Sequence, residues 1–382
     1  RSGFLPKPTT AIIEAVDVTP DGKVYLSSSG GASASYMMMA DRILIERNSY
    51  YGDELKGFHD IYIPEAPPHR TIIPIYTASD RIGTPYVDIP PEKILGIVET
   101  NLADSSSSFA QADENSIAIA HHIVDFLKYE RKIGRLPQGL PYQSGVGNVA
   151  NAVLACMAND PDMEPVSLYT EVVQDSLFEL LENDKLEMAS TCALTFSPEA
   201  QNRFRQDISQ WRKKLIIRQQ EITNSPEVVR RLALISMNTA VEMDIFGNVN
   251  STHVLGSKLI NGIGGSGDFA RNCYLPIFMT PSIGKEGTIS RIVPMVPHVD
   301  HSEHSTQIFV TEQGIADLRG LSPVARARTI IKHCAHPLYK DMLTEYLEYG
   351  LKHAPSRHTP QVLSRAFEMH NRLAETGSML LP

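Results

Sequence analysis

Two Thr-Glu pairs stand where a carboxylate could act as a nucleophile. Thr170-Glu171 and Thr311-Glu312 each close a short apolar run. Such runs are typical of buried strands, so each carboxylate is predicted at the carboxyl end of a strand, where open α/β sheets bind ligands. Glu171 is also predicted to start the next helix, whose dipole would favour a carboxylate anion and suit it to nucleophilic attack. The alternative is that both are solvated acids that cap helices.

The first of two glycine-containing loops comes directly before a predicted helix. Gly145-Val146-Gly147-Asn148 leads into the apolar segment at 149–157. The N–H groups of a helix's first turn are unpaired, and together with the helix dipole they favour a negative group. This loop is therefore a candidate anion site. A tight strand-to-helix turn capped by the side chain of Asn148 is an equally open interpretation.

The second glycine loop, Gly-Ile-Gly-Gly-Ser-Gly at 262–267, fits the GxGxxG pattern. A dinucleotide site would also need a long helix and an acidic residue about 20 positions on. Here the helical segment is short before Pro276, and Lys285 stands near that distance with Glu286 beside it. A loop that approaches another phosphate-bearing or extended ligand is favoured over NAD binding, and a structural turn remains open.

Residues 298–304, His-Val-Asp-His-Ser-Glu-His, hold five groups that could bind a metal. Neither a strand nor a helix would turn all five inward, and no HExxH motif is present. We expect a polar loop that partly lines a site, and no metal. Nearby, Glu242 and Asp244 alternate with apolar residues, which predicts that both lie on the solvent-facing side of a strand.

The elements that would position these groups alternate between strands and helices. Residues 11–18 and 23–26 are predicted to form a hairpin around Thr19-Pro20-Asp21-Gly22, and residues 61–75, with four prolines, are predicted to be mostly loop. A helix is predicted over 114–133 and another after Ser225. The pattern indicates α/β architecture, and the connector at 135–141 is the predicted domain boundary.

The composition is that of an ordinary globular protein, with 42% hydrophobic and 21% charged residues among 382. A net charge of -9 argues against a nucleic-acid binder, which would show a basic stripe, and no apolar run is long enough to span a membrane. The four cysteines are widely spaced without a CxxC motif. We expect reduced thiols and a cytoplasmic location.

Three segments closely resemble the acetyl-CoA hydrolase/transferase family of class I CoA-transferases, which includes succinyl-CoA:acetate CoA-transferases. They are QSGVGNVANAV at 143–153, YTEVVQD at 169–175, and the long run from Asn238 to Asn272. The likeness continues through 292–312 and 316–322 and covers nearly the whole chain. It implies an α/β fold of two tandem CoA-transferase domains, with 1–134 the remainder of the first and 135–382 the second. Members of the family have about a hundred further N-terminal residues, so the first domain is expected to be N-terminally incomplete here.

The resemblance also implies roles for individual residues. Glu171 matches the nucleophile that carries CoA as a glutamyl thioester, and Val146 and Gly265 match the backbone N–H groups of the oxyanion hole. Asn224 and Glu312 match polar residues that line the site. The positions that match CoA-binding residues are Gly145, Val146, Gly147, Asn148, Val149, Asn261, Gly265 and Lys285.

The implied activity is CoA transfer between short-chain acyl-CoA and carboxylates such as acetate and succinate. Hydrolysis of acetyl-CoA by the same residues is the first alternative. A non-catalytic CoA-binding module is the second, and the presence of Glu171 together with both glycine loops counts against it. No cofactor is expected beyond the substrate coenzyme A, and no nucleic-acid or membrane partner. A homodimer is expected because it is the commonest assembly.

Overall fold

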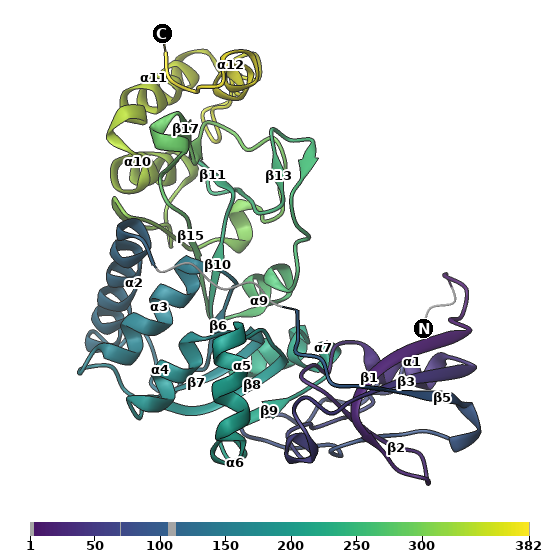
Figure 1. Ribbon diagram of the computed structural model, residues 1–382. Helices are drawn as coiled ribbons and strands as arrows, with labels where there is room; N and C mark the ends of the chain where they lie inside the picture. The colour runs from purple at the N-terminus through teal and green to yellow at the C-terminus, as the bar shows by residue number, and fades with distance from the viewer. Residues whose placement is uncertain (1–3, 69, 106–111, 382) are drawn as a thin grey trace. The chain divides into compact units, whose positions relative to one another are not determined.

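The computed structural model describes residues 4–68, 70–105 and 112–381 (Figure 1). It contains two compact units, each assembled from separate stretches of chain. Unit 1 comprises Arg1–Phe109, Gly139–Ser144 and Glu164–Leu234, and unit 2 comprises Ala110–Gln138, Gly145–Met163 and Ile235–Pro382. Strands and helices mix in both units, which confirms the predicted α/β class. The domain boundary at 134/135 stays a prediction.

Unit 1 contains nine strands among the described residues: β1 (Thr10–Val18), β2 (Lys23–Leu26), β3 (Arg42–Asn48), β4 (Val87–Asp88), β5 (Ile94–Thr100), β6 (Tyr142–Ser144), β7 (Val166–Val173), β8 (Leu186–Leu194) and β9 (Leu215–Ile217). Its α-helices are α1 (Ser33–Met39), α4 (Ser176–Glu182), α5 (Pro198–Gln206), α6 (Ile208–Trp211), α7 (Gln220–Thr223) and α8 (Pro226–Leu232). Two 3-10 turns, η1 (Asp53–Leu55) and η2 (Pro91–Lys93), complete it.

Unit 2 begins with α2 (Glu114–Lys132) and α3 (Asn148–Asn159), which pack side by side. The remaining helices are α9 (Ser266–Asn272), η3 (Lys285–Gly287), η4 (Glu303–Ser305), α10 (Pro323–Cys334), α11 (Pro337–His353) and α12 (Glu368–Thr376). The strands are β10 (Ile235–Thr239), β11 (Glu242–Asp244), β12 (Val249–Asn250), β13 (His253–Val254), β14 (Lys258–Leu259), β15 (Leu275–Met279), β16 (Ile283–Gly284), β17 (Ile289–Ser290), β18 (Ile292–Val293), β19 (Ile308–Thr311) and β20 (Gly314–Asp317).

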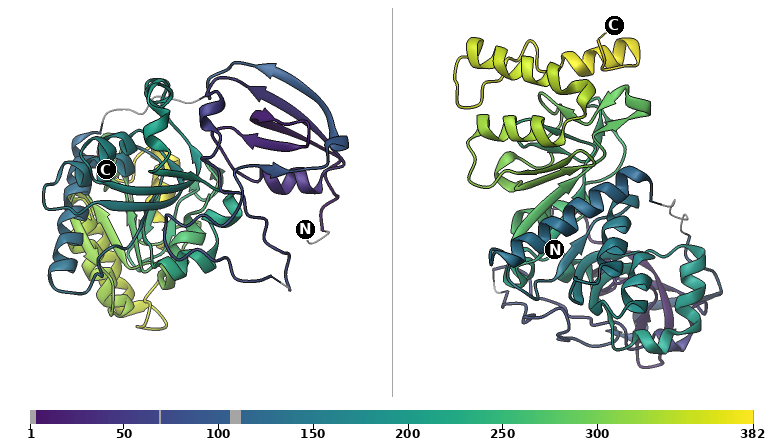
Figure 2. Two further views of the ribbon diagram at one scale, coloured as in Figure 1. Left: turned by 90° about the horizontal axis from the view of Figure 1, so that it is seen from below. Right: turned by 90° about the vertical axis from the view of Figure 1, so that its left-hand side faces the viewer.

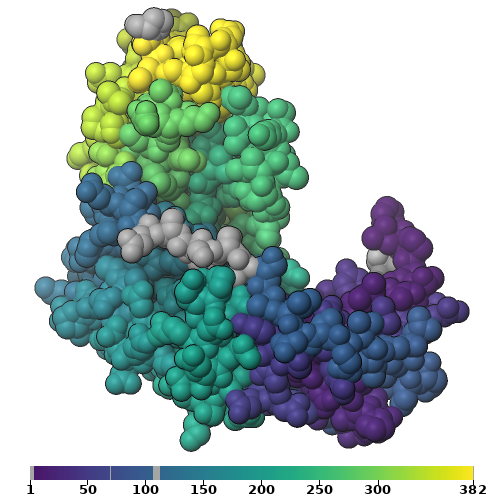
Figure 3. All heavy atoms as spheres, in the orientation of Figure 1, coloured from purple at the N-terminus to yellow at the C-terminus, as the bar shows by residue number. Residues whose placement is uncertain are grey.

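The first sheet of unit 1 has the order β4-β2-β1-β3-β5. β1 and β2 form the predicted hairpin, and β1, β3 and β5 run parallel. Helix α1 covers one face, visible as the purple helix in Figure 2, and buries Ala34 and Met37 against the sheet completely. The other face exposes apolar side chains, among them Ile12 on β1 and Val98 on β5. Strands β1 to β5 are drawn in purple and blue in Figure 3.

The second set of strands in unit 1 runs β6-β7-β8-β9, all parallel. An aromatic cluster of Phe178, Phe196, Phe204 and Trp211 packs edge-on or tilted along α4, α5 and α6. Each of these rings is almost completely buried. The cluster fixes those helices beside the strands. Polar groups lie at the carboxyl ends of β7 and β9.

In unit 2, β10, β15 and β19 are parallel, and β20 returns antiparallel to β19. A separate sheet of order β12-β11-β18 packs into the same apolar core as helices α10 and α11. This core takes in residues from Met243 to Met379 and so ties the C-terminal helices to the strands. In the part of the chain that the structure describes, no helix has the length and apolar character needed to cross a bilayer.

The prediction that Glu242 and Asp244 face solvent is wrong, because both are buried on β11. Glu242 shares a hydrogen bond of 2.9 Å with His370 of α12, and its other oxygen accepts one from Asn250 Nδ2 at 2.8 Å. Asp244 accepts backbone N–H groups of the following turn, including that of Asn248, and burial raises its pKa to about 6. The alternation of polar and apolar residues on this three-residue strand could not predict that the C-terminal helix covers its polar side.

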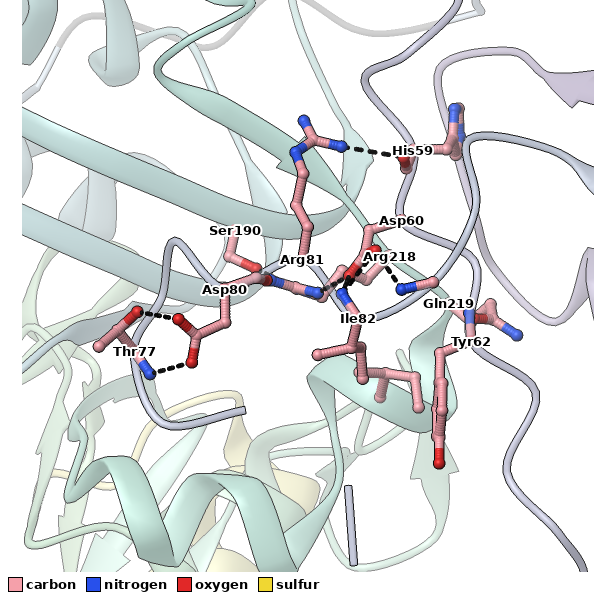
Figure 4. A network of polar contacts seen from close by, with 12 residues as sticks. His59, Asp60, Tyr62, Thr77, Asp80, Arg81, Ile82, Ser190, Arg218 and Gln219 are labelled. Carbon is pink, nitrogen blue, oxygen red and sulfur yellow. Dashed lines mark hydrogen bonds and ion pairs between the residues drawn. The ribbon is translucent and has the colours of Figure 1, made fainter. Parts of the chain in front are cut away.

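Apart from residue 69, which lies outside the described residues, the proline-rich stretch at 61–75 is mostly loop, as predicted. Its neighbours build a buried polar network in unit 1 (Figure 4). Arg218, directly after β9, is completely buried and forms an ion pair with Asp60, which is also buried. Arg218 Nε donates to Ser190 Oγ at 2.6 Å, and one Nη donates to the carbonyl of Asp80. Removing one member of such a buried pair generally costs about 3–5 kcal/mol, because the remaining charge is uncompensated.

His59 lies at the edge of this network and should make the stability of the protein sensitive to acid. Burial, reinforced by the Arg81 guanidinium, lowers the pKa of His59 to about 3. The unfolded chain takes up this proton near pH 6.5, whereas the folded chain resists it until about pH 3. The contribution of His59 is therefore present above pH 6.5 and is lost as the pH falls toward 3.

Replacing His59 with Gln should remove this dependence. Between pH 6 and pH 4, the free energy of unfolding should fall less steeply in His59→Gln than in the parent, by about 1.4 kcal/mol per pH unit. Urea unfolding at a series of pH values measures both slopes. Parallel curves for the two proteins would contradict a neutral buried histidine.

Candidate active site

Glu171 lies within β7, two residues before the strand ends at Val173. The next helix, α4, begins only at Ser176, so the prediction that Glu171 starts a helix is wrong, and so is its helix-dipole argument. The apolar run is followed by further residues of strand because Val172 and Val173 pair with β8. The predicted position near the carboxyl end of a strand is confirmed. The side chain is half-buried.

Both carboxylate oxygens of Glu171 accept hydrogen bonds from neutral amides on one short element. Gln220 Nε2, on the first residue of α7, donates to Oε1 at 3.4 Å. Asn224 Nδ2, at the C-cap of the same helix, donates to Oε2 at 3.1 Å. Thr223 Oγ1 donates to Asn224 Oδ1 at 2.9 Å, which turns the amide nitrogen of Asn224 toward Glu171. A neutral donor orients a carboxylate and leaves its charge in place, which suits a nucleophile.

The backbone around Glu171 is held by two further hydroxyl groups. Thr191 Oγ1 on β8 donates to the carbonyl of Glu171 at 3.0 Å. The hydroxyl of Tyr169, fully buried on β7, donates to the carbonyl of Ile222 in α7 at 2.9 Å. Thr191 thus ties β8 to the main chain of Glu171, and Tyr169 ties β7 to α7. Asn224, predicted from family resemblance, and Glu171 are brought together in unit 1.

In unit 2, the loop Gly145–Gly147 leads into α3 as predicted. The N–H of Gly145 donates to the carbonyl of Met237 at 2.8 Å, which anchors the start of the loop to β10. The N-cap residue of α3 is Gly147, at φ 112°, a conformation that favours glycine; Asn148 is the first helical residue and does not cap the helix with its side chain. Val146 exposes 53% of its surface. Val149 lies one residue further, in the first turn.

The second glycine loop leads into α9, whose N-cap is Gly265. Ser266 Oγ donates to the carbonyl of Ile263 at 2.9 Å and shares a hydrogen bond of 3.1 Å with His301 Nε2. His301 is completely buried, and burial lowers its pKa to about 4, so it meets Ser266 as a neutral ring. Asn261 is exposed and donates to two carbonyls, those of Ser251 and Gly262.

Lys285 lies in an unusual exposed turn. It and Glu286 have φ values of 46° and 54°, so two consecutive residues other than glycine adopt the left-handed conformation. Thr288 holds this turn by donating its N–H and its hydroxyl to the carbonyl of Lys285, at 3.1 and 2.8 Å. Such conformations persist where the surroundings impose them, and they are frequent at functional sites. The exposed ammonium group is available to an anion.

Glu312 directly follows β19, which confirms its predicted position at a strand end. Its carboxylate accepts the N–H of Ser282 at 2.7 Å and also the hydroxyl of Ser282. Gln313 Nε2 donates to the same carboxylate at 3.1 Å. Glu312 is therefore a fixed acceptor held by neutral donors, as Glu171 is in unit 1.

The histidine-rich segment has structural partners. Asp300 accepts the N–H of Ser251 and the hydroxyl of Thr252, and it shares a hydrogen bond of 3.2 Å with His298. The ring of His298 packs against that of His253 at a tilt of 35°, with 3.8 Å between the centroids. Over the described ranges, no group of three or more His, Cys, Asp and Glu side chains is arranged to hold a metal ion.

Three polar residues of these clusters, Gln220, Thr223 and Ser282, were not predicted from the sequence. Gln220 stands four residues before Asn224, and this helical spacing could have predicted that both amides share one face. Ser282 and His301 carry no such signal, because each meets its partner across a long stretch of chain. His301 was predicted only as part of a polar loop that partly lines a site.

Comparison with known proteins decides the family. The chain is 48% identical over 379 residues to propanoyl-CoA:succinate CoA transferase of Escherichia coli, a match that covers 99% of this chain and 76% of that protein. It is 45% identical over 378 residues to an acetyl-CoA hydrolase of Schizosaccharomyces pombe, with 97% and 72% covered. Residues 201–347 match the acetyl-CoA hydrolase/transferase C-terminal domain. The chain belongs to the acetyl-CoA hydrolase/transferase family.

The fold agrees with this family assignment. The solved structure of a 4-hydroxybutyrate CoA-transferase from Porphyromonas gingivalis superposes with a TM-score of 0.64 at 19% identity, covering 91% of this chain and 76% of that one. At this identity, the likeness concerns the fold. The family's members are enzymes that transfer CoA or hydrolyse its thioesters, and this chain is one of them.

The hydroxyl of Thr223 should matter to turnover because it orients the amide of Asn224. In Thr223→Val the amide is free to turn its oxygen toward Glu171, and the acyl-CoA turnover number should fall about tenfold, which corresponds to about 1.4 kcal/mol. Thr223→Ser keeps the hydroxyl and should retain most of the activity. Steady-state kinetics with a thermal melt of each variant measure this, and an active, stable Thr223→Val would refute the orienting role.

Proposed function

We propose that the protein transfers CoA between short-chain acyl-CoA and carboxylates of the acetate and succinate type, with Glu171 as the nucleophile. The observation that carries this proposal is the carboxylate itself, which is half-buried near the end of β7 with a neutral amide on each oxygen. These amides orient the carboxylate for attack and leave its negative charge in place. Family membership supports the reaction class.

The chemistry proceeds through two acyl intermediates. A carboxylate oxygen of Glu171 attacks the thioester carbonyl, the C–S bond breaks, and CoA leaves as a thiolate while a mixed anhydride forms. The thiolate then attacks the glutamyl carbonyl, and the acyl group departs as a free carboxylate that keeps the attacking oxygen. CoA is now held as a glutamyl thioester, and an incoming carboxylate reverses both steps. The kinetics should therefore be ping-pong.

Each step passes through a tetrahedral oxyanion that needs hydrogen-bond donors. On the family resemblance we assign this role to the N–H groups of Val146 and Gly265, each of which would be worth about 3 kcal/mol. Asn224 and Glu312 are assigned as polar groups that contact the reacting atoms.

We assign the binding of the CoA moiety to residues of unit 2. They are Gly145, Val146, Gly147, Asn148, Val149, Asn261, Gly265 and Lys285. The N-terminus of α3 and the exposed ammonium of Lys285 both suit phosphate groups. Binding energy from this remote part of the substrate can be used to drive the acyl transfer. The proposed steps use no cofactor other than the substrate coenzyme A.

Hydrolysis of acetyl-CoA is the second candidate, since a relative of 45% identity carries that name. The two activities differ only in whether water or a carboxylate attacks the glutamyl thioester, so one site serves both. We propose that transfer dominates because the relative of 48% identity is a CoA transferase.

We further propose that the enzyme acts in the cytoplasm as a homodimer. All four cysteines, Cys156, Cys192, Cys273 and Cys334, are free thiols, which is usual for a reducing compartment. The dimer rests on the general preference of oligomeric enzymes for twofold assemblies.

Incubation with acetyl-CoA and a series of acceptors tests the activity. Succinate, propionate or butyrate should each be converted to its CoA thioester faster than free CoA appears, if transfer dominates. Glu171→Gln keeps the shape of the side chain but removes the nucleophile, so it should lower transfer at least about a thousandfold while CoA still binds. Release of free CoA that is unaffected by acceptor would assign the enzyme as a hydrolase, and a Glu171→Gln variant of normal activity would refute the nucleophile.

A further inference from the structure

Arg218 is a fully buried cation whose three guanidinium nitrogens each meet an oxygen from a different segment. The partners are the carboxylate of Asp60, the hydroxyl of Ser190 and the carbonyl of Asp80. Figure 4 shows the guanidinium group lying between Ser190 and Asp60. Asp60 in turn accepts the N–H groups of Ile82 and Gly83, at 2.9 and 2.7 Å. The guanidinium group is planar and has three fixed hydrogen-bond partners. It therefore restricts the position of Arg218 more than apolar packing would.

The backbone of Arg218 is coupled directly to the strand pair that holds Glu171. Its N–H donates to the carbonyl of Thr191 at 2.7 Å, and the hydroxyl of Thr191 donates to the carbonyl of Glu171 at 3.0 Å. On the other side, the carbonyl of Arg218 abuts Gly30 so closely that a Cβ added at Gly30 would clash with the oxygen. The main chain at Arg218 is therefore confined from both sides.

The main chain of α7, the next element, is restricted in the same way. The buried side chain of Gln219 accepts the N–H of Tyr62 at 2.8 Å, and Gln219 is the N-cap of α7. The N–H of Gln220, at the first position of the helix, donates to the carbonyl of Gly31 at 2.9 Å. α7 has only four residues, and a helix of one turn is not stable by itself. Its position is set by these tertiary contacts.

We propose that the buried Arg218–Asp60 pair positions the active site, by fixing residues 218–224 so that Gln220 and Asn224 hold the two oxygens of Glu171. This inference rests on the proposed function, in which Glu171 is the nucleophile. Arg218 and Asp60 are positioning residues, because they act on Glu171 through α7 and Thr191. Gln220 is the last residue in the series of contacts that starts at Arg218, and its side chain contacts the nucleophile directly.

A positioning role and a purely structural role predict different measurements. A displacement of about 1 Å in a reacting group lowers a rate about a hundredfold. A structural role lowers only the fraction of folded protein. The rate constant per folded molecule therefore separates the two.

The first half-reaction gives this rate constant without any acceptor. Acetyl-CoA is mixed with enzyme, and the burst of free acetate, one per active site, is followed by rapid quench. The variants are Arg218→Lys, Asp60→Asn, and the double variant Arg218→Met with Asp60→Asn. The double variant removes both charges together, a change that buried pairs frequently tolerate without loss of stability. The Asp60→Asn substitution keeps a side-chain oxygen that can accept the N–H groups of Ile82 and Gly83.

Each folded variant should show a burst at least about tenfold slower than the parent, with full amplitude and with a dissociation constant for free CoA within about twofold of the parent's. Gln220→Ala alters an exposed side chain that folding does not need, and it should slow the burst several-fold. This variant keeps the proposal falsifiable if the buried variants do not fold. A parental burst rate in Gln220→Ala, or in the folded buried variants, would overturn the proposal.

Glu242→Gln is the matched control, because it disturbs the buried contact with His370 in unit 2 and no residue of 218–224. It should lower the melting temperature and leave the burst rate per folded molecule unchanged. An equal slowing in this variant would overturn the proposal in favour of general destabilisation. Failure of the proposed function is distinguishable, because then the parent itself would give no stoichiometric acetate burst, or Glu171→Gln would give a normal one.

Discussion

The guanidinium group of Arg218 is fully buried, and the positions of the residues around Glu171 depend on it. A buried charge is stable only when its partners are in place, so the order of the segment that follows depends on the contacts of Arg218 with Asp60, Ser190 and Asp80. That segment is α7, which is too short to form alone and which, with its C-cap, carries both amide donors of the nucleophile. The burial of the Arg218 cation is thereby coupled to the geometry of the Glu171 carboxylate.

Neutral donors orient both acidic residues of the proposed mechanism. Glu171 is oriented by the amides of Gln220 and Asn224, and Glu312 by the N–H and hydroxyl of Ser282. An arginine or lysine in place of these donors would stabilise either carboxylate more strongly, but it would also reduce the reactivity of a nucleophile. The buried cation Arg218 instead acts one element away, where it sets positions.

The sequence predicted the elements whose pattern is local. The β1–β2 hairpin, the long helix α2 and the glycine loop before α3 follow from turn residues and apolar spacing. Prediction failed where the deciding contact is distant: Glu242 is buried because His370, 128 positions away in the chain, reaches it. Glu171 lies in a strand and not at a helix start because the pairing of β7 with β8 extends beyond the apolar run. The roles of Arg218 and Asp60, 158 positions apart, had no local signal at all.

In the proposed mechanism, Glu171 carries CoA during the reaction. This proposal is tested most directly by incubating the enzyme with acetyl-CoA in the absence of an acceptor, reducing with borohydride and mapping the peptides by mass spectrometry. A glutamyl thioester is reduced to an alcohol, so we expect the side chain of Glu171 to be converted to a hydroxyl-bearing one, and the change to be absent when acetyl-CoA is omitted. Reduction at another residue, or an unmodified Glu171 in enzyme that turns over normally, would contradict it.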